Sequence, residues 1–340
     1  MPSALFRRIL LAAIVLTTTA SHSFAVLLYR SPTRNTTAPT GPLANSGWQY
    51  QGSFGNFLGT PVAPNWFLTA LHPGGTNTFT LNGTTYNIDQ TFIGDGAGWV
   101  NGPHSDLRLW KIQGSFPSWA PLWDAAVDGS EVGKQLVVFG RGTQRGAVVY
   151  GPVGVARDTA PPGSRVPVHE QKGWLWGTDD HVQSWGTNVV DEIFDASQFD
   201  LGDLLTFDFD RISPLADESS LSNGDSGGAV FIKSGTTWKL AGLNYSVDGP
   251  FRSRPTGKNF LGSIYDAGGL YVADNPPFLV QDGSIDVPAS SYSSRVSSNL
   301  AWIRSVIGPA TEPPSVPEPA SGLALLVCGT IGAMRRRRIS

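Results

Sequence analysis

The sequence predicts an all-β fold, built as two packed β-barrels that are closed by one C-terminal helix. Short runs rich in Val, Ile, Leu, Phe, Trp and Tyr recur along the chain, and Gly, Asp or Pro residues bracket them. The 40 Gly and 25 Pro residues indicate many turns, and the 40% of apolar residues is typical of a folded core. Neither a helical period nor a sequence repeat appears over the same stretch.

The predicted elements follow from these runs. Predicted strands include Trp66–Leu71, Leu107–Ile112, Leu136–Phe139, Ala147–Tyr150, Leu204–Phe209, Ala229–Ile232 and Trp238–Tyr245. The single predicted helix covers Arg295–Ile307, because Val296, Leu300, Ile303 and Ile307 recur at intervals of three and four and so share one face. Gly308 and Pro309 then end the helix.

The N-terminus is predicted to direct export. Arg7 and Arg8 precede the apolar run Ile9–Val15, and Ser23-Phe24-Ala25 has small residues at the positions that a signal peptidase reads. We therefore expect a secretory signal peptide over residues 1–25, cleaved after Ala25. An N-terminal membrane anchor is the alternative, but the apolar run is short for one.

The C-terminus carries a second processing pattern over residues 311–340. Val316–Ser321 precedes the apolar run Gly322–Met334, and Arg335–Arg338 follows it, which holds that end on the cytoplasmic side during export. The pattern resembles the PEP-CTERM sorting signal of Gram-negative bacteria that make extracellular polysaccharide. The resemblance implies that a membrane transpeptidase, an exosortase, cuts near Pro317-Glu318-Pro319. A plain membrane tail anchor is the alternative.

Charge and cysteine content argue against several classes of protein. The formal net charge is -3, but six arginines at the two ends carry positive charge, so the central part has a net charge of -9. An acidic body gives no support to nucleic-acid binding. The single cysteine, Cys328, lies in the C-terminal apolar run, and the five histidines show no zinc-like spacing. We expect no disulfide in the body and no metal or organic cofactor.

The strongest functional motif is Asn223-Gly224-Asp225-Ser226-Gly227-Gly228. Glycines around a serine allow a sharp turn that exposes the hydroxyl. The amides of Gly224 and Ser226 are then expected to point into one cavity as an oxyanion hole. A serine hydroxyl also needs a neighbouring imidazole to take its proton. For the motif alone, a Gly-rich β-turn without chemistry is the alternative.

A histidine and an aspartate stand where such a serine requires them. Ala63–Leu71 is an apolar run that ends in His72, so the core can hold the backbone while the ring emerges at its edge. Asp106 directly precedes the predicted strand Leu107–Ile112, where a buried carboxylate can fix the histidine tautomer. Each residue alone would more often be structural.

Together, these segments resemble the chymotrypsin/trypsin family of serine proteases. The family's motifs are matched by Leu68-Thr69-Ala70-Leu71-His72, Asp106-Leu107-Arg108-Leu109-Trp110 and Gly224–Gly228, in the family's order His, Asp, Ser. Tyr292–Ile303 resembles its closing strand and helix, and the resemblance covers about residues 47–308. It implies two six-stranded antiparallel β-barrels with a C-terminal helix, in a protease domain over residues 26–310.

The chain departs from the family pattern at several places. Leu71 replaces a small residue before the histidine, Pro73 follows where a cysteine is common, and Ala229 replaces a frequent proline. The stretch Arg157–Val182 has no counterpart that can be aligned. None of these changes removes a catalytic group.

The resemblance implies a secreted endopeptidase that acts on proteins or peptides through an acyl-enzyme. Ser226 would attack the peptide carbonyl, and His72 would act as base and then as acid. Asp106 would orient His72, while the amides of Gly224 and Ser226 would hold the oxyanion. Asp89 and Asp95 are the alternative acids.

The resemblance also implies an activating terminus and a specificity pocket. Asp225 is expected to pair with a new N-terminal ammonium, which cleavage after Ala25 places on Val26; a later cut after Arg30 or Arg34 is the alternative. Ser220, six residues before the nucleophile, is expected at the base of the pocket. A hydroxyl there argues against a strong preference for Lys or Arg, because a buried cation would lack a partner.

Two rival functions remain open at this point. A catalytically silent member could serve as a matrix or adhesion protein in extracellular polysaccharide, with Trp174, Trp176 and Trp185 stacking on sugar rings. The other rival is a small-ester hydrolase that uses the same triad.

Overall fold

The computed structural model describes residues 26–152, 169–272 and 276–308. The predicted signal peptide (1–25) and the predicted sorting segment (311–340) lie outside the described residues. Among the helices of the described residues, none is long and apolar enough to cross a membrane.

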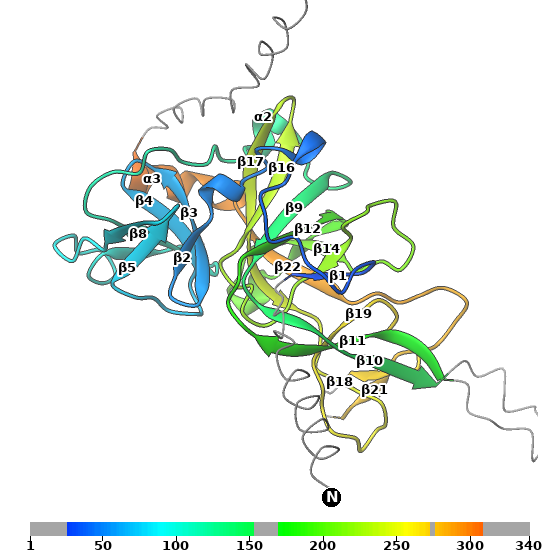
Figure 1. The fold of residues 1–340 in the computed structure, drawn as a ribbon. Helices are drawn as coiled ribbons and strands as arrows, with labels where there is room; N and C mark the ends of the chain where they lie inside the picture. Colours follow the sequence, from blue (N-terminus) through cyan, green and yellow to red (C-terminus); the bar gives the residue numbers. More distant parts are fainter. Residues whose placement is uncertain (1–25, 153–168, 273–275, 309–340) are drawn as a thin grey trace, which may run out of the picture.

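Residues 52–111 form an antiparallel sheet of seven strands, blue to cyan in Figure 1, in the order β6-β5-β2-β3-β4-β8-β7. Its strands are β2 (Gly52–Phe54), β3 (Phe57–Ala63), β4 (Trp66–Ala70), β5 (Thr78–Leu81), β6 (Thr84–Asn87), β7 (Trp99–Asn101) and β8 (Leu107–Lys111). An aromatic cluster that includes Phe54, Phe67, Phe79 and Trp110 fills the core of this sheet. The rings of Phe67 and Phe79 stack with centroids 4.1 Å apart.

A second antiparallel sheet of seven strands follows, in the order β12-β9-β16-β17-β22-β14-β13. Its strands are β9 (Gln135–Gly140), β12 (Ser184–Val189), β13 (Glu192–Asp195), β14 (Asp203–Asp208), β16 (Ala229–Ser234), β17 (Thr237–Val247) and β22 (Ser290–Arg295). Leu136, Val138, Val230 and Ile232 are fully buried in one of its cores. Short helical turns are η1 (Gly41–Leu43), η2 (Trp48–Tyr50), α2 (Ala125–Asp128) and η4 (Ser197–Phe199).

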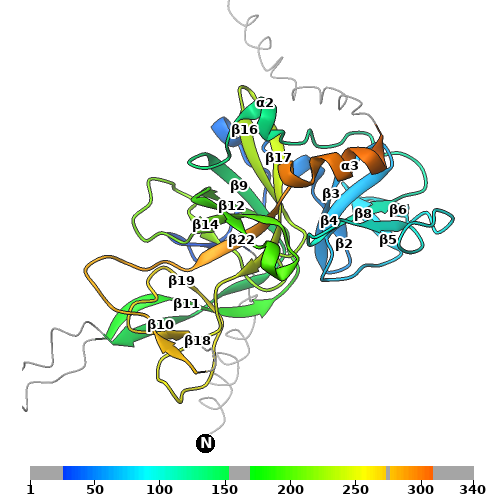
Figure 2. The ribbon, with the colours of Figure 1, turned by 180° about the vertical axis from the view of Figure 1, so that it is seen from behind.

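One core is shared by both sheets. Leu58 and Leu68 of the first sheet lie in the same buried cluster as Phe139 and Phe231 of the second, together with Ile303 of the C-terminal helix α3 (Leu300–Ile307). Figure 2 shows α3 beside the first sheet, although β22, which leads into it through η5 (Ser297–Asn299), belongs to the second. The helix therefore connects the two halves.

The sequence predictions for this fold are confirmed in part. All seven predicted runs lie in or overlap strands, and the predicted buried face holds, with Val296 and Ile303 fully buried. The helix begins later than predicted, because residues 297–299 form a 3-10 turn, and Gly308 ends it in a left-handed backbone conformation. The expected count of six strands in each of two barrels is not confirmed, since each sheet has seven strands in an open ladder order.

The stretch that could not be aligned contributes to an added layer. A long hairpin pairs β10 (Thr143–Pro152) with β11 (His169–Asp179), and β19 (Gly262–Ile264) adds to β11. A small sheet of β18 (Phe251–Arg252), β20 (Tyr271–Val272) and β21 (Phe278–Leu279) lies below the hairpin in Figure 1. The tip of the hairpin, residues 153–168, lies outside the described residues.

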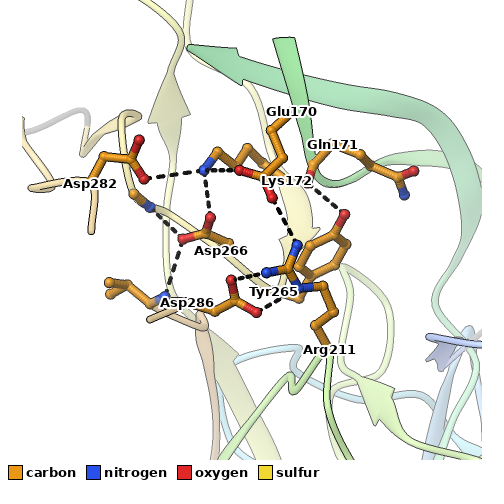
Figure 3. A network of polar contacts seen from close by, with 10 residues as sticks. Glu170, Gln171, Lys172, Arg211, Tyr265, Asp266, Asp282 and Asp286 are labelled. Carbon is orange, nitrogen blue, oxygen red and sulfur yellow. Dashed lines mark hydrogen bonds and ion pairs between the residues drawn. The ribbon is translucent and has the colours of Figure 1, made fainter. Parts of the chain in front are cut away.

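A buried ammonium ties this layer together (Figure 3). Lys172 of β11 is 0% exposed, and its Nζ lies 2.5 Å from Asp266 Oδ2 and 3.4 Å from Asp282 Oδ1. Arg211 bridges Glu170 and Asp286 beside it. Because a buried charge needs compensating partners, these contacts hold the long segment before β22 against the hairpin.

Candidate active site

His72 and Asp106 are neighbours because their strands pair. All five residues of β4 are buried, and Ala70 at its end lies opposite Leu107 at the start of β8. His72 leaves the sheet just after β4, and Asp106 stands just before β8. The backbone amide of Leu71 donates to the Asp106 carbonyl at 3.0 Å, which keeps the end of β4 next to the start of β8.

The Asp106 carboxylate accepts two hydrogen bonds from His72. Its Oδ1 accepts the backbone N–H of His72 at 2.9 Å, and its Oδ2 lies 2.7 Å from the ring Nδ1. Asp106 is only 4% exposed, and a carboxylate can only accept. The ring proton therefore belongs on Nδ1, which leaves Nε2 free to accept a proton.

Neither alternative acid contacts His72 among the described residues. Asp89 accepts from the Thr91 side chain and lies 3.5 Å from the Lys111 ammonium. Asp95 accepts the backbone N–H of Asn101 at 2.7 Å. Both carboxylates serve local turns of the first sheet.

Ser226 reaches His72 from the second sheet. Its Oγ lies 2.8 Å from His72 Nε2, so a continuous hydrogen-bonded chain runs from Asp106 through His72 to the serine. The loop needs its glycines. Gly227 has φ +72°, and a Cβ there would lie 2.2 Å from the Thr69 hydroxyl; a Cβ on Gly228 would lie 2.0 Å from the Phe139 carbonyl oxygen.

Two backbone donors flank the serine. Across the residues that the structure describes, the amides of Gly224 and Ser226 donate to no protein acceptor. Gly224 has φ +94°, another conformation that favours glycine. Unpaired backbone donors next to a half-buried hydroxyl have the composition of an oxyanion hole.

The structure also brings Asp225 and Val26 together. The Asp225 carboxyl is 1% exposed and accepts the amides of Gly142 and Ser222, each at 2.7 Å, and that of Val26. Burial raises the pKa of Asp225 to about 6, although these hydrogen bonds oppose the shift. The Val26 side chain is fully buried in the core of the second sheet.

The residues after Val26 contact several separate segments of the chain. Strand β1 (Leu27–Leu28) pairs with β15 (Ser219–Ser220), which places Leu27 opposite Ser220. The Tyr29 ring packs edge-to-face against Trp174, Phe209 and Tyr265. Arg34 pairs with Asp180 at 2.9 Å. Ser220 itself is 5% exposed and donates to the Leu221 carbonyl at 3.1 Å, and its place in a specificity pocket stays a prediction.

Sequence reasoning missed three residues near the site. Tyr245 of β17 packs its ring edge-to-face on His72, with centroids 5.7 Å apart. Asn244 beside it contacts the serine loop. The Asp179 carboxylate lies 3.0 Å from where a Gly224 Cβ would be. Only Asn244 left a detectable signal, since asparagine is unfavourable inside a predicted strand.

Trp174 and Trp185 do not present their rings as platforms, because they are 4% and 8% exposed. Trp176 is partly exposed. In the described part of the chain, no three His, Cys, Asp or Glu side chains gather in a way that could hold a metal ion.

The sequence matches no protein-family model and no curated protein. Among solved structures, the chain is similar to an HtrA-type protease, AlgW with tripeptide, with a TM-score of 0.41 and 13% identity. The match covers 78% of this chain and 62% of that one. At this level of similarity the match says nothing about activity.

Proposed function

We propose that this chain is a serine endopeptidase with His72, Asp106 and Ser226 as its catalytic triad. The observation that carries the proposal is the unbroken chain of hydrogen bonds from Asp106 to Ser226, next to two backbone amides without acceptors. Such a constellation performs acyl transfer on unrelated folds, so geometry defines it better than overall similarity does.

The mechanism follows from the donors and acceptors. His72 Nε2 takes the proton of the Ser226 hydroxyl as its oxygen attacks the peptide carbonyl. The amides of Gly224 and Ser226 stabilise the negative oxygen, which is worth about 3–4 kcal/mol per donor. Asp106 stabilises the imidazolium, which then protonates the leaving amine. Water then attacks the acyl-enzyme carbonyl while His72 Nε2 takes its proton. The imidazolium returns that proton to Ser226 Oγ as the acyl group leaves.

The direct test is covalent labelling. Purified mature protein should react with a fluorophosphonate probe at Ser226, and Ser226→Ala and His72→Ala should abolish labelling while the protein stays folded. Labelling that persists in Ser226→Ala would reject the assignment. Cleavage of peptides as well as small esters would separate an endopeptidase from the ester hydrolase.

The rival role as a silent sugar-binding protein is less well supported. A sugar platform requires an exposed aromatic face, whereas Trp174 packs among Tyr29, Phe209 and Tyr265. A binding module also has no need for a histidine whose ring and backbone both hydrogen-bond to one buried carboxylate.

We further propose a pocket without strong preference for basic residues, with Ser220 at its base. A peptide panel should show no large preference for Arg or Lys over Phe, Tyr or Leu. Ser220→Asp should shift the preference toward basic residues. A wild-type protein that is strongly selective for Arg would contradict the proposal.

Export and sorting are proposed from the two ends of the sequence. Signal peptidase would cleave after Ala25, and an exosortase-type enzyme would act near Pro317-Glu318-Pro319, which leaves the protein outside the cell or at its surface. Mass spectrometry of the protein from its native host should find no Arg335–Arg338. A full-length tail would favour a plain membrane anchor.

A further inference from the structure

One buried side chain fastens the serine loop to the second sheet and takes no part in the mechanism above. Asn244 of β17 is 1% exposed. Its Nδ2 donates to the Asp225 carbonyl at 3.0 Å and to the Phe139 carbonyl at 2.7 Å. Its Oδ1 accepts the Ser293 hydroxyl at 3.2 Å. Both donors and the acceptor of this amide are therefore used.

The Asn244 backbone holds the same loop from the other side of the serine. Its N–H donates to the Gly228 carbonyl at 2.8 Å, and its carbonyl accepts the Gly227 N–H at 3.1 Å. The loop is thus attached to one residue both before and after Ser226. A Cβ on Gly228 would lie 2.9 Å from Asn244 Nδ2, so the glycine makes room for this attachment.

The bond to the Asp225 carbonyl has a consequence for Ser226. That carbonyl and the Ser226 N–H belong to one planar trans peptide group, so they point in opposite directions. The carbonyl oxygen accepts two hydrogen bonds, one from Asn244 Nδ2 and one from the Gly228 N–H at 3.1 Å, and Asn244 supplies the only side-chain donor of the two. The Ser226 N–H is therefore turned away from Asn244. It is one of the two amides that find no acceptor among the described residues.

The second oxyanion donor has no comparable support. The Gly224 N–H shares its peptide group with the Asn223 carbonyl, and within the described ranges that carbonyl accepts no hydrogen bond from the protein. Asn223 is also exposed. Of the two oxyanion donors, only the Ser226 N–H belongs to a peptide group that a side chain holds in place.

We propose that Asn244 is a positioning residue for the oxyanion hole. Together with the Gly228 N–H, its Nδ2 fixes the plane of the Asp225–Ser226 peptide and so the direction of the Ser226 amide. The inference rests on the proposed acyl-transfer function. Since Asn244 is buried, it acts on the reaction only through this peptide group.

The test compares Asn244→Asp and Asn244→Ser with Ser293→Ala. The aspartate keeps the size of the side chain but places an oxygen, which cannot donate, opposite the Phe139 and Asp225 carbonyls. The serine side chain is too short to reach both carbonyls. Ser293→Ala removes the partner of Oδ1 and leaves both Nδ2 donors, so it serves as the matched control. Each variant is quantified by active-site titration with a fluorophosphonate, so that kcat refers to folded sites only.

We expect kcat of the Asn244 variants to fall at least tenfold, toward the loss of about 10²- to 10³-fold that follows removal of an oxyanion donor. KM should stay within about twofold, because substrate binding is untouched. Affinity for a peptide aldehyde, whose hemiacetal oxygen occupies the oxyanion site, should fall in parallel with kcat. The shape of the pH profile of kcat should be the same as in the wild type, and Ser293→Ala should behave like the wild type.

A crystal structure of Asn244→Asp supplies a readout that does not depend on activity. The Asp225–Ser226 peptide should be rotated relative to the wild type, and an unchanged peptide plane would overturn the proposal. A normal kcat per titrated site would overturn it too, because the role would then be structural only. A wild-type protein that neither labels nor cleaves peptides would reject the protease function, while the peptide plane would still decide the role of Asn244.

Discussion

At the residue scale, the candidate triad depends on how one carboxylate is used. Asp106 accepts from both the backbone and the ring of His72, so the position and the tautomer of the imidazole are set by the same group. The ring proton on Nδ1 is what makes Nε2 a base. The role of Asp106 can therefore be tested without changing its size.

Asp106→Asn should lower kcat by about 10⁴-fold, because the amide would favour the wrong histidine tautomer. The protein should remain folded, since the replacement keeps one acceptor for the His72 backbone N–H. Peptide turnover and thermal unfolding measure the two effects. Asp95→Asn is the control, because that carboxylate serves a turn at Asn101. A loss of turnover in Asp95→Asn but not in Asp106→Asn would show that the wrong acid has been assigned.

A second residue-scale prediction concerns Glu218, which is 1% exposed. Its carboxyl accepts the Ser213 hydroxyl at 2.8 Å and the Asp210 amide at 3.2 Å. Burial raises the pKa of Glu218 to about 8, and the neighbouring carboxylates of Asp210 and Asp191 add to the shift. The folded protein thus holds a proton that the unfolded chain releases near its ordinary pKa of 4.5.

The consequence for stability has a definite sign. Between the unfolded and the folded pKa of Glu218, the free energy of unfolding should fall as pH rises, by up to about 1.4 kcal/mol per pH unit from this group. Glu218→Gln should remove that contribution. In denaturant titrations from pH 5 to 8, the free energy of unfolding of the variant should therefore rise relative to that of the wild type. Glu192→Gln, at an exposed site of β13, should run parallel to the wild type. A constant difference between Glu218→Gln and wild type would contradict the shifted pKa.

At the element scale, the strands that could be predicted from the sequence are those with a local apolar pattern. Strand β4 and the first four residues of β16 are buried throughout, and β8 is mostly buried, so composition and bracketing turns were enough to predict them. The three motifs could be placed next to strands for the same reason. The edge strands β7 and β13 are short, half-buried in β7 and mostly exposed in β13, so no buried run marks them in the sequence. The expected count of six strands in each barrel came from the family resemblance.

Contacts between distant segments could not be read from the sequence. The pairing of β1 with β15 joins residues about 190 positions apart, and the role of Asn244 depends on a loop that precedes it in the chain. The long hairpin β10–β11 is held by Lys172, whose acidic partner Asp266 lies 94 residues away. The contacts of Val26 with Asp225 and of His72 with Ser226 were anticipated, and there the family resemblance supplied the pairing.

The contacts of β1 lead to a prediction about processing. A start at Val26 would place an ammonium beside the Asp225 carboxyl, whereas a cut after Arg30 would delete β1 and the Tyr29 ring. N-terminal sequencing of active protein should therefore find Val26. Protein with one extra residue before Val26 should be strongly impaired, since removing the charged partner of a buried carboxylate costs about 3–5 kcal/mol. Full activity with such an extension would end the idea that this terminus activates the enzyme.

At the scale of the whole molecule, the candidate triad is divided between the two sheets. His72 and Asp106 stand on the first sheet, and Ser226 stands in a loop of the second. The 2.8 Å contact between His72 and Ser226 therefore depends on how the sheets are held together. Their shared core includes Ile303 of α3, which is fully buried.

Ile303→Ala should lower the free energy of unfolding by about 2–5 kcal/mol, the usual cost of such a cavity. Ile112→Ala is the matched control, because Ile112 is 2% exposed and lies in the cluster confined to the first sheet. Both variants should lose similar stability in denaturant unfolding. Under native conditions, only Ile303→Ala should lower kcat per titrated site, since only that cavity lies where the two sheets meet. If both variants kept a normal kcat, α3 would be a stabilising element without influence on the alignment of His72 with Ser226.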